Sequence, residues 1–336
     1  MEQIFSQVLF GTTAAVTLVG NTLVVILFLK KRNWLEKTHA CLLLALAIQD
    51  VVTAVTLLVL PGFALPLHFY DLPASPSLRA LYCGIVWSLY IPFALSVVSI
   101  YTCLMLAVDR LLAVWRPLTY KRLCSSRKTK ATMVILPWVA GFLSELGTAL
   151  NVQNSRQNNG SYLCERVTIN RSLENMVIGL ILFLLKGFVP AVLMAVAYWK
   201  MMITLKQASL RVSQNTTGGN SPATRDETKS HLALKRITRM ACAASALVVT
   251  CWLPDQIYYC LFELNIIPMD NSLHNGLHIL AFLNTSFNPF LYSFSNRQYK
   301  EEFKKILGCA FRRNTPLRSE FDATCTEQNR QELHGI

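Results

Sequence analysis

Seven long apolar segments, separated by polar connections, dominate the pattern of this chain. A helix needs about 20 mostly apolar residues to cross a membrane, because the hydrocarbon core is about 30 Å thick and a helix rises about 1.5 Å per residue. Segments of that length predict membrane-spanning helices at Ile4–Leu29, His39–Pro61, Leu81–Val114, Ala131–Leu150, Leu173–Leu205, Ile237–Leu264 and Leu273–Phe294. The expected fold is all-α, a bundle of seven transmembrane helices followed by a short amphipathic eighth helix at Tyr299–Leu307.

The basic residues lie mainly on alternate connections, and this gives the helices an expected topology. Most of the 32 Lys and Arg residues fall in the first, third and fifth connections and after the last span. Basic residues favour the cytoplasmic side, so we expect an extracellular N-terminus and a cytoplasmic C-terminus in the plasma membrane. We expect no nucleic-acid partner, because the net charge of +13 is not gathered on a folded soluble domain.

This topology divides the chain into three expected parts. A short extracellular N-terminus spans residues 1–5, the seven-helix domain with its eighth helix spans 6–308, and a cytoplasmic tail spans 309–336. The stretch Ser209–Lys229 is rich in Ser, Thr, Asn and Gly without a hydrophobic period, and it predicts a flexible cytoplasmic loop.

The cysteines and sequons suggest covalent modification at both faces of the membrane. Cys83 opens the third span on the expected outer side and Cys164 lies in the long outer loop, so we expect a disulfide there. Asn159 and Asn170 in the same loop are candidate glycosylation sites. Cys309 follows the amphipathic segment and is a candidate palmitoylation site.

Polar residues at membrane depth are costly and therefore mark function or a buried pair. Asp50 lies within the second span, and Asn21 and Asn288 fall at comparable depth in the first and seventh. Their oxygens are suited to a small cation such as sodium, with Asp50 as the metal-ligating carboxylate. The alternative is a hydrogen-bonded structural network without an ion.

Three further charges fall toward the expected outer halves of the spans, namely Glu145, Lys186 and Asp255. We expect Lys186 to pair with Glu145 or Asp255 and to contact a polar ligand. The alternative is a purely structural buried pair.

Prolines in five spans predict kinks, because each removes a backbone donor. They are Pro61, Pro92, Pro190, Pro254 and Pro289. Kinked helices around a polar core suit a two-state switch, but they are also common in transporters.

A set of motifs, taken in order and spacing, resembles class A, rhodopsin-like G-protein-coupled receptors. The resemblance covers roughly Gly20–Cys309. The motifs are Gly20-Asn21, Leu44–Asp50, Asp109-Arg110, Trp138, Pro190 with Tyr198, Cys251-Trp252-Leu253-Pro254 and Asn288-Pro289-Phe290-Leu291-Tyr292.

The resemblance implies a role for each matching position. Asn284 would join Asp50, Asn21 and Asn288 in a sodium-linked network, and Trp252 would be an aromatic toggle beneath the ligand. The residues expected to couple the receptor to a heterotrimeric G protein, or to switch it, are Asp109, Arg110, Pro117, Leu118, Tyr198, Trp252, Pro254, Pro289 and Tyr292. Tyr299 and Phe303 would seat the eighth helix along the membrane. Arrestin and membrane lipids are the other expected partners, with no cofactor besides an allosteric sodium ion.

The chain departs from the family pattern at three places. Leu111 replaces the usual Tyr after Asp109-Arg110, and Leu234 stands where some relatives have an acid opposite the Arg. An ionic lock between those helices is therefore not expected, and basal activity is expected to be appreciable. Cys83 and Arg110 are two positions further apart than usual, so we expect a distortion in the outer half of the third span.

The ligand class follows from the residues near the expected outer face. No Asp or Glu occurs between Cys83 and Asp109, where amine receptors carry an acid, so we do not expect a monoamine receptor. The pocket candidates are Trp87, Tyr90, Phe93, Lys186, Trp252, Asp255, Gln256, Tyr259, His274 and His278. Aromatic groups with both signs of charge suit a short peptide.

The expected function is therefore that of a receptor for a short peptide, similar to the galanin, allatostatin and somatostatin receptors, in neuropeptide signalling. A receptor for a small organic or lipid-derived ligand is the alternative, as is a decoy or arrestin-only receptor that does not couple to G proteins. An enzyme is not expected, because Asp50 lacks a second mid-span Asp partner for intramembrane proteolysis.

Overall fold

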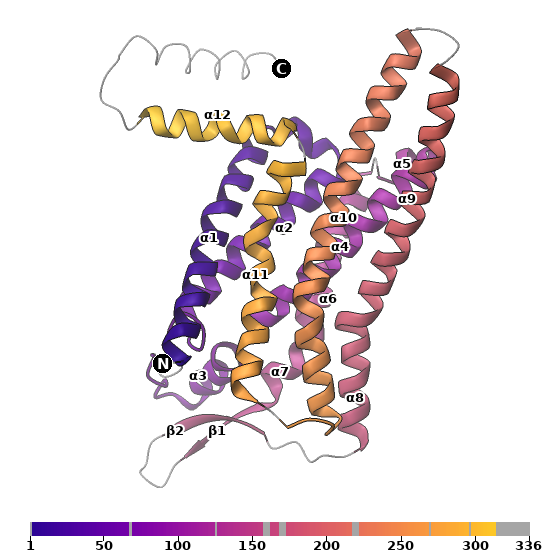
Figure 1. Ribbon diagram of the computed structural model, residues 1–336. Coiled ribbons are helices and arrows are strands. Elements are labelled where there is room, and N and C mark those ends of the chain that lie inside the picture. Colours follow the sequence, from indigo (N-terminus) through magenta and orange to yellow (C-terminus); the bar gives the residue numbers. More distant parts are fainter. Residues whose placement is uncertain are drawn as a thin grey trace.

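The computed structural model describes residues 2–66, 69–124, 126–156, 162–167, 173–216, 222–268, 270–295 and 297–313. These residues form a bundle of long helices with a small two-stranded sheet (Figure 1). The elements in chain order are α1 (Glu2–Lys30), η1 (Arg32–Glu36), α2 (Thr38–Val59), α3 (Pro76–Leu81), η2 (Tyr82–Trp87), α4 (Tyr90–Trp115), α5 (Pro117–Cys124), α6 (Arg127–Ser144), α7 (Leu146–Leu150), β1 (Val152–Arg156), β2 (Tyr162–Arg166), α8 (Leu173–Phe183), η3 (Leu184–Phe188), α9 (Val189–Thr216), α10 (Pro222–Glu263), α11 (Asn271–Ser295) and α12 (Arg297–Arg313).

Six of the described helical stretches are long and apolar enough to cross a membrane. They are Gln3–Lys30, Thr38–Val59, Tyr90–Trp115, Arg127–Leu150, Met176–Ala208 and Leu232–Glu263. The seventh member of the bundle, α11, has 25 residues but is more polar, since it carries His274, His278, Asn284 and Asn288. Its polar residues face partners inside the protein, as described below.

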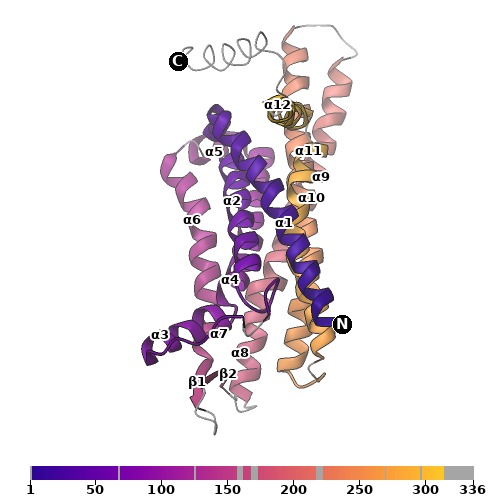
Figure 2. The same ribbon diagram turned by 90° about the vertical axis from the view of Figure 1, so that its left-hand side faces the viewer.

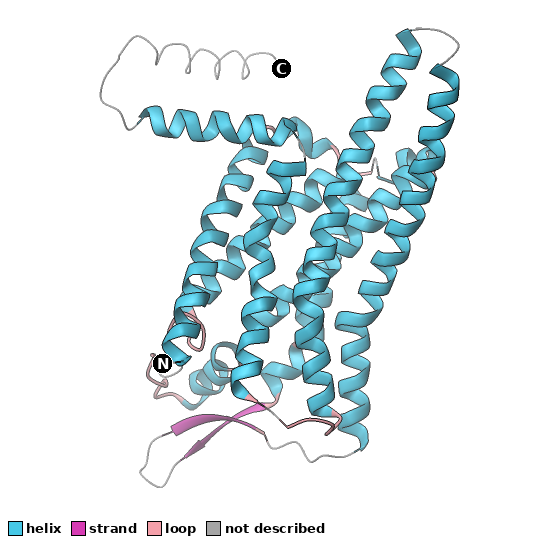
Figure 3. Cartoon of the chain, in the orientation of Figure 1, coloured by secondary structure: helices cyan, strands magenta, loops and turns pink. Residues whose placement is uncertain are grey.

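The two ends of the bundle differ in their covering elements. β1 and β2 pair antiparallel, with Asn154 opposite Cys164, and lie across the end at which the N-terminus is found (Figures 1 and 3). We call this the sheet end. At the other end, α12 lies crosswise to the bundle and is seen along its axis in Figure 2. We call this the α12 end.

The third span is broken where the sequence has its two-residue surplus. η2 is a π-helix, and Leu89 between η2 and α4 adopts the left-handed conformation with φ 61°. The π-turn and the left-handed residue interrupt the helix within the segment that carries the surplus, and this confirms the expected distortion. Pro92 then lies in the first turn of α4, where its missing N–H has no intrahelical partner to lose.

Two of the five predicted proline kinks are therefore wrong. Pro92 begins a helix instead of bending one, and Pro61 lies beyond the end of α2 at Val59. Pro254 and Pro289 do lie within α10 and α11. Pro190 is the second residue of α9, directly after the π-helix η3, so a wider turn precedes it.

The flexible loop predicted at Ser209–Lys229 is also largely wrong. α9 continues to Thr216 and α10 begins at Pro222, and both helices project beyond the rest of the bundle at the α12 end (Figure 1). A helix that leaves the membrane has already met its nucleation cost, so it can continue through weak helix formers. Pro222 suits a first helical position, because its φ is already helical.

Close packing at two glycines sets the distances between neighbouring helices. A Cβ on Gly20 would lie 2.8 Å from Pro289 Cγ, and one on Gly141 would lie 2.8 Å from the carbonyl oxygen of Ala94. α1 therefore meets α11, and α6 meets α4, at distances that a larger residue would not permit. The large apolar side chains on the outside of the bundle, such as Leu180, are suited to lipid.

The helix α12 is held by an aromatic cluster. Tyr299 and Phe303 are buried, and the Tyr299 ring lies 5.9 Å from Phe28 and 4.9 Å from Trp34. Lys31 Nζ adds an ion pair at 3.7 Å to Glu302 Oε2. These contacts hold the predicted amphipathic helix across the end of α1.

Candidate functional site: a polar ligand region and a coupling end

A disulfide joins Cys83 of η2 to Cys164 of β2, as predicted. It ties the small sheet to the entrance of the third span. The Arg79 guanidinium of α3 lies 3.3 Å from the centre of the Tyr162 ring and adds a contact between the sheet and α3, which directly precedes η2. The loop before the fifth span is thus fixed over the sheet end of the bundle.

Lys186 forms a buried ion pair with Glu145. Lys186 Nζ lies 2.9 Å from Glu145 Oε1, and both residues are under a tenth exposed. The π-helix η3 presents Lys186, while Glu145 lies at the break between α6 and α7 and also accepts a hydrogen bond from Thr148 Oγ1. The sequence left two possible partners for Lys186, and the structure shows that it pairs with Glu145 and not with Asp255.

Asp255 instead lies within a cluster that spans α10 and α11. His278 Nε2 lies 3.5 Å from Asp255 Oδ1, and Gln256 Nε2 donates to Asp255 Oδ2 at 3.2 Å. The rings of His274 and His278, one helical turn apart, have their centres 4.0 Å apart. Asp255 is 3% exposed, so this carboxylate is shielded from solvent within the protein.

The other predicted ligand contacts lie in η2, at the start of α4 and on α10, and one of them, Phe93, contacts this cluster. The Phe93 ring lies 4.9 Å from His278, and Trp252 lies one turn before Asp255 and is almost fully buried. Tyr90 donates its hydroxyl to the carbonyl oxygen of Phe142 and is thereby turned toward α6. The remaining two are Trp87, half-buried in η2, and Tyr259, 38% exposed on α10.

The Asp50 cluster lies deeper in the bundle. Asn288 Nδ2 donates to Asp50 Oδ2 at 2.7 Å, and Asn21 Nδ2 donates to the carbonyl oxygen of Thr285 at 3.0 Å. Asn284 donates to the carbonyl oxygen of Ala281. Four side-chain oxygens are buried without a hydrogen-bond partner among the described residues: Asn21 Oδ1, Asp50 Oδ1, Asn284 Oδ1 and Asn288 Oδ1. Oxygen ligands of this kind fit a hard cation such as sodium.

Arg110 is buried at the α12 end among partners from three elements. Its Nε donates to Asp109 Oδ2 at 2.9 Å, its Nη2 lies 3.1 Å from His39 Nδ1, and Nη2 donates to Tyr120 Oη at 3.2 Å. Burial, together with the Asp109 carboxylate, raises the pKa of Tyr120 to about 12, so the hydroxyl stays neutral. The contacts of His39 and Tyr120 were not predicted, since neither residue belongs to a motif.

The remaining coupling candidates lie at the α12 end or along α9 to α11. Pro117 and Leu118 lie in α5, where Leu118 is 82% exposed and open to a partner. Tyr198 and Ser245 join α9 to α10 through hydroxyl oxygens 2.9 Å apart. Tyr292 is fully buried, and its hydroxyl has no hydrogen-bond partner in the described part of the chain.

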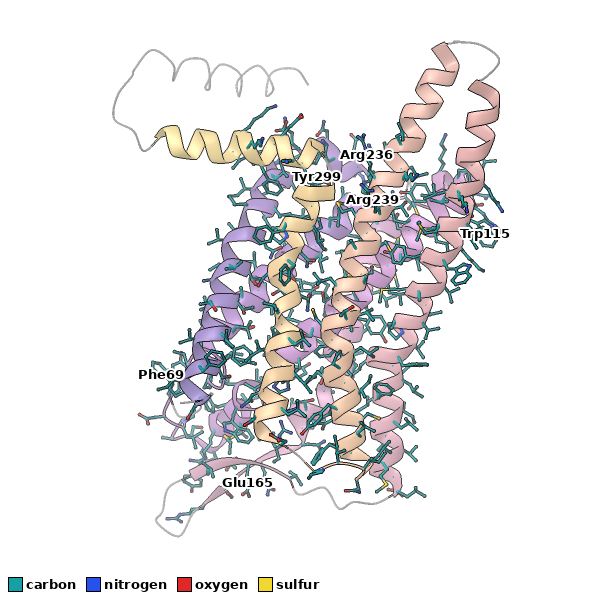
Figure 4. The ribbon with its side chains drawn as sticks, in the orientation of Figure 1. Phe69, Trp115, Glu165, Arg236, Arg239 and Tyr299 are labelled. Carbon is teal, nitrogen blue, oxygen red and sulfur yellow. A yellow bond between two sulfur atoms is a disulfide. The ribbon has the colours of Figure 1, made fainter. Side chains whose placement is uncertain are left out.

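Figure 4 places Arg236, Arg239 and Tyr299 at the α12 end and Glu165 in the sheet at the opposite end. The α10 helix therefore contributes basic side chains to the end that holds Arg110. Cys309 lies within α12. The sequons at Asn159 and Asn170 lie outside the described residues.

Comparison with known proteins identifies the family of this chain. The family described as "7 transmembrane receptor (rhodopsin family)" matches residues 20–292. The chain is 26% identical to the dog histamine H2 receptor over 95% of this chain and 84% of that receptor. It is 24% identical to the silkworm allatostatin-A receptor, over 92% and 82%, and 26% identical to a D(5)-like dopamine receptor of Takifugu rubripes, over 88% and 65%.

Members of this family are multi-pass proteins of the plasma membrane and act as receptors, not enzymes. The match begins within the first span, ends within the seventh, and includes the Asp50 cluster, Arg110 and the Asp255 cluster. The chain belongs to the rhodopsin-like, class A family of G-protein-coupled receptors.

Proposed function

We propose that this receptor binds a short extracellular peptide at its sheet end and activates a heterotrimeric G protein at its α12 end. In this proposal the N-terminus and the sheet face the outside, and the C-terminus lies in the cytoplasm, as the distribution of basic residues predicts. The single observation that supports a polar ligand best is the cluster of Asp255, Gln256, His274 and His278 between α10 and α11.

The chemistry of this cluster is suited to a peptide. A carboxylate, an amide and two imidazoles offer both donors and acceptors, which is what backbone amides and a terminal ammonium need. Phe93 and Trp252 add aromatic surface for an apolar side chain. The silkworm relative, named as an allatostatin-A receptor, belongs to a group that the sequence also resembles.

A small amine is the second candidate, and a specific observation favours it. The third span has no acid between Cys83 and Asp109, but Asp255 supplies a buried carboxylate from the sixth, and its Oδ1 has no hydrogen-bond partner among the described residues. An ammonium would pair with that oxygen. Relatives named for histamine and dopamine are consistent with this candidate.

The coupling end is proposed to act through Arg110. An outward swing of α10 would expose the guanidinium, which is now held by Asp109, His39 and Tyr120, to a G-protein segment. Arrestin would compete for the same end. Palmitoylation of Cys309 would add a lipid anchor to α12, and a sodium ion at Asp50 would stabilise the state without agonist.

A ligand screen with a paired coupling assay tests this proposal. Cells expressing the receptor would be treated with short neuropeptides and with biogenic amines, while G-protein and arrestin recruitment are recorded in parallel. We expect a peptide to recruit G protein, and Asp255→Asn to weaken its potency at least tenfold. Arrestin recruitment without G-protein recruitment would contradict the proposed coupling and indicate a decoy or arrestin-only receptor. Activation by an amine alone would replace the peptide.

A further inference from the structure

We propose that Asp255, His274 and His278 form a binding site for a Zn²⁺ ion that joins α10 to α11 near the sheet end. The inference goes beyond the proposed receptor function, because metal binding by these three residues does not depend on which organic ligand the receptor takes.

The arrangement of donor atoms supports a single metal position. One ligand atom from each of the three residues lies within 4.8 Å of the other two. Zinc bonds of about 2.0–2.2 Å in a tetrahedral site place neighbouring donor atoms roughly 3.5 Å apart. The distance of 3.5 Å between His278 Nε2 and Asp255 Oδ1 already has this value. The His274 ligand atom lies within the same 4.8 Å limit, so the three donors surround one position.

The helical spacing explains how the two imidazoles meet. His274 and His278 are four residues apart on α11, so both side chains lie on one face of that helix. Histidines at this spacing on one helix are a recurring zinc-binding arrangement. Asp255 reaches the same place from α10, directly after Pro254, and supplies the third ligand from a different helix.

Two atoms of the cluster lack partners in a way that a metal ion would correct. Asp255 Oδ1 and His274 Nδ1 are both buried, and neither has a hydrogen-bond partner among the described residues. Leaving a buried polar atom unpaired costs about 1–3 kcal/mol. A cation bound by both atoms would satisfy them at once.

The neighbouring residues resemble the supporting shell of a metal site. Gln256 Nε2 donates to Asp255 Oδ2 at 3.2 Å, which orients the carboxylate and leaves Oδ1 for the metal. The centre of the Phe93 ring lies 4.9 Å from that of His278, and this contact limits the positions of the imidazole.

The donor set selects the metal. Two imidazole nitrogens and one carboxylate oxygen suit zinc, whereas magnesium and calcium prefer six or more oxygen ligands. Three protein ligands leave a fourth tetrahedral position open. That position would be occupied by water or by a donor atom of the receptor's own ligand.

Direct metal binding by the full-length receptor tests the inference. The purified receptor in detergent would be stripped with a chelator and dialysed against ZnCl₂, and bound zinc would be counted by atomic emission. We expect one high-affinity zinc per receptor, with MgCl₂ and CaCl₂ at equal concentration failing to displace it. His274→Ala, His278→Ala and Asp255→Asn should each weaken zinc binding at least tenfold.

A matched control separates this site from general histidine binding. His231→Ala removes a histidine from a part of α10 far along the chain from Asp255, and it should leave zinc affinity unchanged. Thermal midpoints without metal would verify that each variant folds.

The outcomes distinguish this inference from the proposed function. Equal zinc binding by the wild type and the double variant His274→Ala/His278→Ala would overturn the site. Zinc binding without any response to peptides would leave the site standing and count against the peptide. A peptide response in a receptor that binds no zinc would reject the site alone.

Discussion

The two ends of the bundle differ in how their polar groups are tied. At the sheet end, a disulfide, the Lys186–Glu145 ion pair and the Asp255–His278 contact each join separate elements. At the α12 end, Arg110 contacts Asp109, His39 and Tyr120, from α4, α2 and α5. From the family resemblance we expect Leu234 of α10 to occupy the position where some relatives have an acid. The comparison teaches that cross-links hold the sheet end, whereas no described side chain of α10 forms an ion pair with Arg110.

The largest expected effect comes from breaking the covalent tie at the sheet end. Replacing both Cys83 and Cys164 by Ser opens a loop with a sequence separation of 81. Loop-closure entropy predicts a loss of about 4 kcal/mol in the free energy of unfolding. Thermal midpoints of the purified receptor would measure it. Cys242→Ser, a half-buried free thiol, is the control, and an equal midpoint in both variants would contradict the prediction.

Breaking the ion pair at the sheet end should have the next largest effect. Lys186→Met leaves Glu145 buried without its cation and should lower the free energy of unfolding by about 3 kcal/mol. The double variant Lys186→Met/Glu145→Gln should recover most of the loss, because it removes both charges. Thermal midpoints of the purified single and double variants would measure the loss and the recovery of stability.

The same variants test whether Lys186 touches the ligand. Lys186→Arg keeps the charge and should keep the stability. If Lys186→Met and Lys186→Arg show equal agonist potency once expression is matched, the lysine has only the structural role.

A third experiment tests whether the Asp50 cluster, which lies between the two ends, binds sodium. Sodium at ten times its dissociation constant should stabilise the wild type by about 1.4 kcal/mol, and Asp50→Asn should abolish that gain. The measurement is the thermal midpoint in sodium against N-methylglucamine. Asp255→Asn should keep the sodium response, because Asp255 is not among the residues whose unpaired oxygens form the proposed sodium site. A sodium response that survives Asp50→Asn would show that the ion binds elsewhere.

The smallest expected effect comes from adding an acid to α10 at the α12 end. Leu234→Glu would supply an acid on α10 to pair with Arg110 and should lower ligand-independent signalling about twofold to fivefold, as expected for a pair worth about 0.5–1 kcal/mol. Leu234→Gln is the uncharged control. If basal signalling of the wild type is no higher than in mock-transfected cells, the expectation of appreciable basal activity is wrong.

The sequence predicted the spans well because the length of an apolar segment is a local property. α1, α2 and α11 begin and end close to the predicted limits. α10 ends close to its predicted limit but begins much earlier, at Pro222. The small sheet was not predicted, since Val152–Arg156 and Tyr162–Arg166 show little alternation of apolar and polar residues. The break at Leu89 was expected from the spacing, but spacing does not specify a π-turn followed by a left-handed residue.

The candidate site was predictable in composition but not in pairing. Charge at membrane depth identified Glu145, Lys186 and Asp255 as interacting residues, yet helix rotation decides which two meet. The sequence could not supply that rotation, so Lys186 had two possible partners. The proximity of Asp255 to His274 and His278 depends on how α10 and α11 face each other, which is also a tertiary property.

Pro254 divides α10 into a short arm toward the sheet end and a long arm toward the α12 end. Roughly 14 Å of helix lies between Pro254 and Glu263, and roughly 48 Å lies between Pro254 and Pro222, at about 1.5 Å per residue. If the rod pivots at the proline, a shift of the short arm by a bound molecule is magnified about threefold at the far tip. A movement smaller than a covalent bond on the sensing side then becomes a displacement that a partner protein can detect.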